Sequence, residues 1–313
     1  MSSSAAEGLL LVIVGPTASG KSALGIALAT ALGGEIISCD SVQLYRGFDV
    51  GAAKTPEAER EGVAHHLLDI LSPTDKATAG DYARMARRTI EEVSRRGRLP
   101  VVVGGTGLYL RAALRGLFRG PGRDEALRAR LELITVEKSP RRLHEILTRI
   151  DPDSAGRIHW NDQPKLIRAI EVCLVSCRPF SKVLGDDTEE PLEGFRITQL
   201  GLAPPREALY ERIDRRTKQM FAEGILEEVL GLLGAGVPET AWPFGAVGYK
   251  QAVAAVRGDM DAVEAAAAAA QATRRYAKRQ MTWFRQQEPT TIWLEGFGDD
   301  PEIKKAAYAI AKR

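Results

Sequence analysis

A glycine-rich stretch near the start of the chain, Gly15 to Ser22 (GPTASGKS), has the residue types and spacing of a loop that binds a diphosphate or a triphosphate. Its two glycines permit a tight turn, Lys21 can reach the phosphates, and Ser22 offers a hydroxyl to a Mg²⁺ ion that bridges them. The apolar run LLLVIV precedes the loop and ALGIALATAL follows it, as expected of a strand and a helix. The sequence therefore predicts a phosphate site and leaves open which phosphate binds there.

Polar side chains follow two further apolar runs. Asp40 stands directly after EIISC, where a carboxylate suits a magnesium ligand, a general base or a helix cap. Thr106 follows LPVVVGG, where its hydroxyl suits either a contact with a phosphate oxygen or nucleophile, or a simple turn. Lys54 and Arg46 add positive charge after Asp40, although each by itself is typical of a solvated surface residue.

Strand and helix signals alternate around these loops. Apolar, β-branched runs at 9–14, 35–39 and 99–104 are separated by helical patterns at 21–32 and 81–97, with short glycine-containing connections. This alternation predicts an α/β fold, a P-loop NTPase-like parallel sheet flanked by helices. Because open α/β sheets bind ligands at the carboxyl ends of their strands, we expect the three loops to meet at one edge.

A change of pattern in the middle of the chain predicts a second domain. Between about Gly116 and Gly194 the β-branched runs nearly vanish, and amphipathic stretches such as SPRRLHEILTRI take their place. We therefore predict an all-helical insertion domain at 116–194 that divides the core domain into residues 1–115 and 195–313. In the second part, FRITQLGL and TTIWLEG resume the sheet, and long helical patterns cover 206–234 and 259–287.

Composition excludes several classes of protein. With 44% hydrophobic and 27% charged residues, the chain is typical of a globular protein rather than a disordered one. No apolar run approaches the ~20 residues that cross a bilayer, and the start lacks a basic leader, so we predict no membrane association and a cytoplasmic location. The three cysteines form no C-x-x-C pair, and His65 and His66 would face opposite sides of a strand. Neither a disulfide framework nor a zinc site is indicated.

Basic residues gather in the last long helical pattern although the net charge is only +2. Between positions 271 and 285 there is no acidic residue, and the basic residues are Arg274, Arg275, Lys278, Arg279 and Arg285. Such a run is either a solvated helix face or a contact for nucleic acid.

Seven motifs in this chain resemble, in the same order, those of bacterial tRNA dimethylallyltransferases, also called tRNA isopentenyltransferases. They span about residues 8 to 295 and read GPTASGKS, DSVQLYRGFDVGAAK, HHLLDI, GGTGLYLRAAL, RIDRRTKQMFAEGILEEV, GAVGYKQ and AKRQMTWFR. The resemblance implies transfer of a dimethylallyl group from dimethylallyl diphosphate to the exocyclic amine of the adenosine 3′-adjacent to the anticodon, in tRNAs that read codons beginning with U. It also implies Mg²⁺ as cofactor and tRNA as partner, and we expect a monomer.

The same resemblance implies roles for single residues. Asp40 is expected to accept a proton from the adenine amine, with Thr106 near the amine and the diphosphate. Arg212 and Arg216, four residues apart on one helix face, are both candidates for holding the diphosphate. Contacts with the diphosphate are expected from Gly15, Pro16, Thr17, Ala18, Ser19, Gly20, Lys21 and Ser22, with Ser22 also holding Mg²⁺.

Contacts with tRNA are expected around the flipped adenine and at three more distant segments. Near the adenine they come from Asp40, Ser41, Val42, Gln43 and Thr106. Further away they come from Arg123, Pro164, Lys165, Leu166, Ile167, Arg168, Gly245, Ala246, Val247, Gly248, Tyr249, Lys250, Lys278, Arg279, Gln280, Met281, Thr282, Trp283, Phe284 and Arg285. Of these we expect Trp283 and Phe284 to pack within the protein rather than stack on bases.

Two alternatives remain at this point. An adenylate isopentenyltransferase shares the loop and the base but modifies a free nucleotide, whereas the insertion and the basic run suit a large polyanion. The second alternative, of a different class, is a P-loop small-molecule kinase or a non-catalytic RNA-binding module that has a P-loop. A protein that had lost the activity would be expected to have changed Lys21, Asp40 or Thr106, and all three are present.

Overall fold

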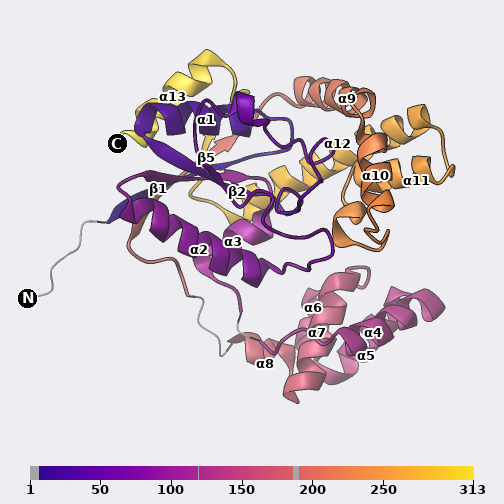
Figure 1. Cartoon of the computed structure of the whole chain (residues 1–313). Helices are drawn as coiled ribbons and strands as arrows, with labels where there is room; N and C mark the ends of the chain where they lie inside the picture. Colours follow the sequence, from indigo (N-terminus) through magenta and orange to yellow (C-terminus); the bar gives the residue numbers. More distant parts are fainter. Residues whose placement is uncertain (1–6, 119, 186–189) are drawn as a thin grey trace, which may run out of the picture. The chain divides into compact units, whose positions relative to one another are not determined.

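The computed structural model describes residues 7–118, 120–185 and 190–313, which form two compact units (Figure 1). The first unit comprises the chain up to Arg115 together with Pro191–Arg313. The second is Gly116–Glu190. Each unit has its own hydrophobic core.

The first unit is built on a parallel sheet of six strands in the order β3-β2-β4-β1-β5-β6. All five pairings between neighbouring strands are parallel. This arrangement confirms the α/β fold of the P-loop NTPase type that the sequence predicts. The strands are β1 (Gly8–Val14), β2 (Gly34–Cys39), β3 (His65–His66), β4 (Leu99–Gly104), β5 (Phe195–Leu202) and β6 (Ile292–Leu294).

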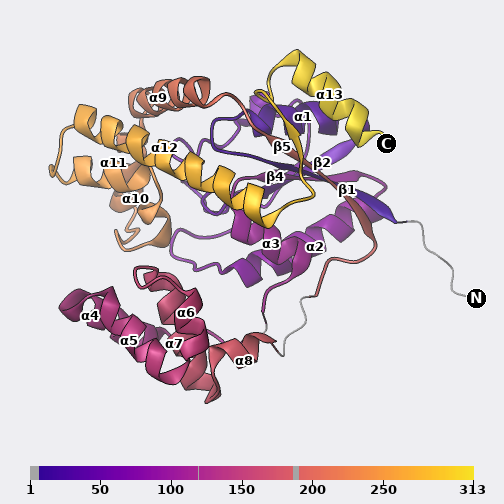
Figure 2. The same ribbon diagram turned by 180° about the vertical axis from the view of Figure 1, so that it is seen from behind.

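Helices cover both faces of the sheet, which explains why its central strands are apolar throughout. In β1, Leu10 and Val12 belong to the core beneath α2 (Ala79–Arg95) and α3 (Gly107–Arg115). Leu11 and Ile13 point the other way, into the core beneath α1 (Lys21–Leu32) and α13 (Pro301–Ala311). The two layers lie on opposite sides of the sheet in both views (Figures 1 and 2).

The register of the central strands brings their carboxyl ends together. Val14 of β1 and Cys39 of β2 both lie opposite Gly104 of β4. The three loops that follow these strands therefore begin side by side. Only glycine fits at position 104, because a Cβ atom there would lie 2.1 Å from the carbonyl oxygen of Cys39.

Four helices complete this unit beside the sheet. The predicted helical stretch at 206–234 is two helices, because Gly224 has φ 108° and breaks it. The longest helix, α12, begins with a capping box in which Asp261 and Glu264 satisfy each other's backbone amides. The helices are α9 (Arg206–Ala222), α10 (Ile225–Gly234), α11 (Tyr249–Val256) and α12 (Ala262–Gln287), and the 3-10 turns are Glu57–Glu59 and Trp242–Gly245.

The second unit is helical throughout its described elements and packs around leucines and isoleucines. Its carboxyl boundary lies four residues before the one expected at Gly194, because Leu192 packs into the first unit and donates a backbone hydrogen bond to Leu114 (2.8 Å). Its helices are α4 (Glu125–Lys138), α5 (Pro140–Ile150), α6 (Pro152–Arg157), α7 (Gln163–Ser176) and α8 (Phe180–Gly185).

Within the described ranges, no helix is long and apolar enough to span a membrane.

Candidate functional site

A cleft with a volume of about 1090 Å³ opens at the carboxyl edge of the sheet. Its walls come from the loops after β1, β2 and β4 and from helices α9 and α12. Seven cationic side chains line it, namely Lys21, Lys54, Arg60, Arg212, Arg215, Arg216 and Lys304. The volume lies at the upper end of the range of ligand pockets.

The glycine-rich loop has the backbone geometry of an anion-binding turn. Gly15 and Gly20 have φ values of 148° and 86°, and Ala18 between them has φ 63°. Helix α1 starts at Lys21, and no side chain caps its first amides, so they are available to an anion at the positive end of the helix. The loop residues that line the cleft are Thr17, Ala18, Gly20, Lys21 and Ser22.

Three of the loop residues expected to contact the diphosphate also shape the turn. Gly15 and Pro16 do not line the cleft, and the Pro16 carbonyl accepts a hydrogen bond from the Lys21 ammonium (2.7 Å). Ser19 is fully buried, because the segment around Gly298 packs behind it and donates a backbone hydrogen bond to its carbonyl (2.9 Å).

Burial and neighbouring positive charges lower the pKa values of two cations beside the loop. Burial lowers the pKa of Lys21 to about 8, Asp40 opposes this change, and Arg216 adds to it. Burial also lowers the pKa of Arg216, and the neighbouring Arg212 acts in the same direction. Lys21 and Arg216 are thus two neighbouring buried cations without a paired carboxylate in the described ranges, an arrangement that an anionic ligand stabilises.

The two candidate arginines of α9 differ in their partners. Arg212 donates to Asp299 (2.8 Å) and stacks over Phe297, with 4.8 Å from its guanidinium carbon to the ring centroid. Arg216 forms no ion pair with any carboxylate in the part of the chain that the structure describes. Its guanidinium is therefore the one whose charge remains available to a ligand.

Asp40 and Thr106 lie on adjacent loops. One carboxylate oxygen of Asp40 accepts hydrogen bonds from the backbone amides of Val42 (2.8 Å) and Gln43 (3.3 Å). These bonds close a turn and not a helix, so the helix-cap alternative is wrong. The Thr106 hydroxyl accepts a hydrogen bond from the Ser41 amide (3.1 Å), which joins the two loops. Asp40 also lines the cleft, so closing this turn and proton transfer are compatible roles for its two oxygens.

Gln43 lies against the same cleft and is held in one orientation. Its carbonyl oxygen accepts a hydrogen bond from the Ser38 hydroxyl (2.9 Å), and its amide nitrogen donates to the Ala52 carbonyl (3.2 Å). The amide orientation is set by this pair of contacts, as a group that reads a base edge requires.

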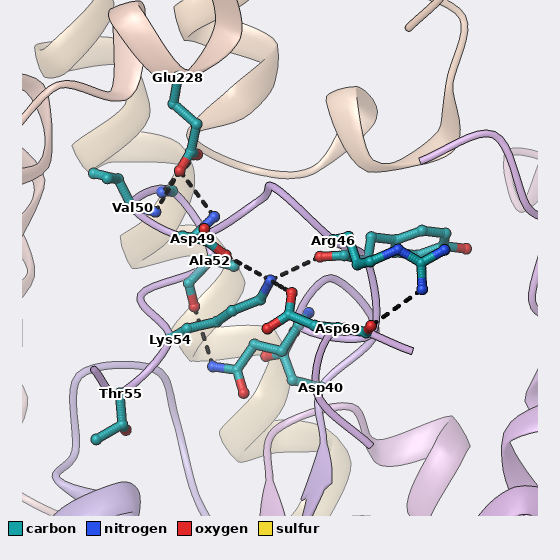
Figure 3. A network of polar contacts seen from close by, with 12 residues as sticks. Asp40, Arg46, Asp49, Val50, Ala52, Lys54, Thr55, Asp69 and Glu228 are labelled. Carbon is teal, nitrogen blue, oxygen red and sulfur yellow. Dashed lines mark hydrogen bonds and ion pairs between the residues drawn. The ribbon is translucent and has the colours of Figure 1, made fainter. Parts of the chain in front are cut away.

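A carboxylate from α10 holds the loop that carries Ala52 (Figure 3). Glu228 accepts hydrogen bonds from the amides of Asp49 (2.9 Å) and Val50 (2.7 Å) and from the Tyr249 hydroxyl (2.5 Å). Sequence reasoning missed Glu228, because nothing in the pattern ILEEV links it to a loop 178 residues away.

Lys54 is buried, which corrects the expectation of a solvated lysine. Its side chain is 5% exposed and its ammonium forms ion pairs with Asp49 (2.7 Å) and Asp69, and a hydrogen bond with the Tyr45 carbonyl (2.7 Å) (Figure 3). The polar contacts explain its burial, since a buried ammonium needs acceptors around it. Arg46 remains on the surface and donates to the Asp69 carbonyl (3.3 Å).

The residues that could hold Mg²⁺ are few. No group of three or more His, Cys, Asp or Glu side chains suitable for a metal occurs among the residues that the structure describes. Ser22 lines the cleft at the start of α1, where its hydroxyl can serve as one ligand. A single protein ligand fits Mg²⁺, which keeps several waters and takes its remaining ligands from phosphates.

Several residues expected to contact tRNA have buried side chains, so their side chains do not form part of the surface open to tRNA. In the second unit, Leu166 and Ile167 fill the core of the helical bundle. In the first unit, Tyr249, Gln280 and Phe284 are at most 7% exposed. Helical periodicity explains the result, because one face of each amphipathic helix must pack against its neighbours.

The basic residues of the second unit are partly engaged within it. Arg168 donates to the buried Glu171 (2.8 Å) and to the Pro121 carbonyl (3.0 Å). Lys165 pairs with Asp162, and Arg123 pairs with Glu125. The segment Pro164–Arg168 lies at the start of α7. Pro164 and Lys165 are exposed, and Arg168 is partly exposed.

The outer face of α12 presents a shallow groove of about 490 Å³. Arg274 does not contribute to it, because its guanidinium pairs with Asp214 of α9. Arg285 lies over the Trp293 ring (5.8 Å). We call this surface the α12 groove, and its lining residues are Arg275, Lys278, Arg279, Thr282, Trp283 and Gln286.

Tyr276 is a cleft residue that sequence reasoning missed. It lies one helical turn before Gln280 and lines the cleft. Burial raises the pKa of its hydroxyl, and the nearby Asp40 carboxylate raises it further. The sequence did carry a signal for it: Tyr276 and Gln280 are four residues apart in RRYAKRQ, a spacing that places both side chains on one helix face.

Comparisons with known proteins give a consistent result. A family model described as IPP transferase matches residues 43–287. A tRNA dimethylallyltransferase of Koribacter versatilis is 52% identical over 97% of this chain and 98% of that protein.

Solved structures similar to this chain come from the same kind of enzyme as the sequence relatives. The tRNA isopentenylpyrophosphate transferase of Bacillus halodurans is 36% identical, with a TM-score of 0.71 over 98% of this chain and 95% of that one. A eukaryotic dimethylallyltransferase, solved in crystallographic snapshots of its action on tRNA, is 25% identical, with a TM-score of 0.76 over 96% of this chain and 77% of that one.

The lowered pKa of Lys21 predicts how anion binding depends on pH. Below about pH 8 the ammonium is charged before the ligand arrives, whereas above it binding must first take up a proton. The affinity for inorganic diphosphate should therefore fall by up to about tenfold per pH unit above pH 8. Calorimetric titration from pH 6.5 to 9.5 measures this, with Lys21→Arg as the control that stays charged. Parallel profiles for the two proteins would contradict the assignment.

Proposed function

The chain belongs to the IPP transferase family, and from this premise we propose that it transfers a dimethylallyl group from dimethylallyl diphosphate to an adenosine of tRNA. It is a prenyltransferase of the tRNA dimethylallyltransferase type. The acceptor we propose is the exocyclic amine of the adenosine 3′-adjacent to the anticodon in tRNAs that read U-starting codons, and the product is N6-isopentenyladenosine. One observation carries the proposal: a single cleft contains both a cationic diphosphate loop and the carboxylate of Asp40.

The diphosphate half of the cleft suits a leaving group. As the bond between the allylic carbon and its oxygen breaks, the electron pair goes to the diphosphate, whose negative charge grows. Amides at the start of α1, Lys21 and Arg216 surround this position with positive charge. Positive groups that are already in place stabilise the negative charge that develops on the diphosphate in the transition state. Mg²⁺ held by Ser22 would neutralise part of the same charge.

The other half of the cleft suits the acceptor. The adenine nitrogen forms a bond to the allylic carbon and gives up a proton, for which the Asp40 carboxylate is the available base. Extracting a base from a folded tRNA loop costs a few kcal/mol, which stacking and edge contacts must recover. The fixed amide of Gln43, which lines the same cleft as Asp40, supports such an edge contact.

The α12 groove suits the phosphate backbone of the tRNA. Arg275, Lys278 and Arg279 line it, and none of the three forms an ion pair within the described ranges. Trp283 adds an aromatic side chain whose far side packs against Gly107, where a Cβ would lie 2.3 Å from the ring. A free nucleotide has no need of this extended surface, which argues against the adenylate isopentenyltransferase alternative.

Replacing Asp40 by Asn tests the base. Asparagine keeps an oxygen that caps the Val42 amide but cannot take the proton, so turnover should fall by roughly 10²–10⁴-fold. The affinity for tRNA should stay within about threefold, since the fold and the α12 groove are untouched. Single-turnover transfer of labelled prenyl groups and filter binding measure the two quantities. A variant with unchanged turnover would remove Asp40 from the mechanism.

The two arginines of α9 should respond differently to the same substitution. Arg216→Gln should weaken binding of inorganic diphosphate by about 10- to 100-fold, the loss of one charged hydrogen bond of ~1.5–3 kcal/mol. Arg212→Gln should weaken it by less, because Asp299 already neutralises that guanidinium. Calorimetric titration of both variants gives the comparison. A larger loss in Arg212→Gln would reverse the two assignments.

Neutralising the α12 groove should reduce the salt dependence of tRNA binding. In the triple variant Arg275→Gln, Lys278→Gln, Arg279→Gln, the slope of log affinity against log salt should fall in magnitude by about 2, since each lost phosphate contact removes ~0.7–0.9. Arg274→Gln is the matched control, because Arg274 lies on the same helix but pairs with Asp214. Equal slopes in wild type and triple variant would place the tRNA elsewhere.

A further inference from the structure

Gln280 is a buried polar side chain on the inner face of α12, and it joins two loops of the cleft. It is 7% exposed. Its carbonyl oxygen accepts a hydrogen bond from the Thr17 amide in the glycine-rich loop (2.8 Å), and its amide nitrogen donates to the Gly105 carbonyl after β4 (2.9 Å). One side chain therefore fixes the diphosphate loop and the β4 loop relative to each other.

The Gln280 side chain packs closely against the backbone of Gly105. A Cβ atom at position 105 would lie 2.3 Å from the amide nitrogen of Gln280, so the close approach depends on glycine there. The same Cβ would lie 3.5 Å from the Gly15 carbonyl, so the two loops are already in contact distance of each other. The bridge is thus part of the tightly packed floor of the cleft.

The contacts continue from the β4 loop to the proposed base. Thr106, the residue after Gly105, donates its amide to the Cys39 carbonyl (3.2 Å) and accepts from the Ser41 amide (3.1 Å). Asp40 lies between these two residues in the chain. An unbroken chain of contacts therefore runs from the diphosphate loop through Gln280 to the loop that carries Asp40.

We propose that Gln280 is a positioning residue that sets the distance between the bound diphosphate and the carboxylate that takes the proton. This inference rests on the proposed function. It also replaces the expected contact between Gln280 and tRNA, since the side chain is enclosed by Thr17 and Gly105. Displacement of the diphosphate from the allylic carbon by the adenine nitrogen needs near-attack geometry, and an error of about 1 Å can cost ~10²-fold in rate.

Glutamine is suited to this role because it supplies one acceptor and one donor at the end of a single side chain. Gln280→Glu keeps the size and the acceptor for the Thr17 amide, but places a carboxylate against the Gly105 carbonyl. Gln280→Met keeps nearly the same volume and removes both hydrogen bonds. Gln271→Leu, an exposed position on the same helix, is the matched control.

The test measures kcat and KM for tRNA and dimethylallyl diphosphate, tRNA affinity and thermal unfolding in the full-length variants. We expect both Gln280 variants to be folded, to lose about 10- to 100-fold in kcat and to keep tRNA affinity within about threefold. Gln271→Leu should match wild type. The double variant Gln280→Met, Thr106→Ala should lose less than the product of the single losses, because both changes disturb the same chain of contacts.

Three results would overturn the inference. Folded Gln280 variants with wild-type kcat would show that the bridge does not position the reactants. A loss confined to tRNA affinity would make Gln280 a tRNA contact after all. Failure of both variants to fold would make it a packing residue. Absence of transfer by the wild-type protein would instead contradict the proposed function, so the two failures are distinguishable.

Discussion

The parallel register of β1, β2 and β4 is the constraint on which the rest of the structure depends. Because Val14 and Cys39 both end opposite Gly104, the three loops that follow must leave the sheet at one point. Each loop alone carries one group: a phosphate-binding turn, a carboxylate or a threonine. Because the three loops lie side by side, these groups line one cleft, where a leaving group and a proton acceptor can lie close together. Helices α9 and α12 close it from the side.

Electrostatics then give the two halves of the cleft different characters. Burial and the charge of Arg216 lower the pKa of Lys21, and burial and the charge of Arg212 lower the pKa of Arg216. The cations of the diphosphate site therefore carry unfavourable charge that an anion relieves. Arg212, paired with Asp299, supports the fold of this wall. The affinity for a diphosphate thus follows from the arrangement of these cations.

Much of this could be predicted from sequence, because local patterns determine it. The P-loop, the alternation of strands and helices, and the positions of Asp40 and Thr106 after apolar strands all follow from short motifs. What could not be predicted depends on tertiary packing. Nothing in AKRQMTWFR says which face of α12 turns inward, so Gln280 was expected among the tRNA contacts. Glu228 likewise holds a loop far away in the chain, and the second unit's own core buries Leu166.

The measurement that tests the central claim most directly is transfer of label from dimethylallyl diphosphate by the purified protein with Mg²⁺. Unmodified tRNA with adenosine 3′ to its anticodon and free AMP are offered in separate reactions, and ATP hydrolysis is followed in a third. The account predicts label in tRNA alone, located on the exocyclic amine of that adenosine, and no appreciable ATP turnover. Label in AMP alone would favour the adenylate isopentenyltransferase alternative, and label in neither would contradict the account.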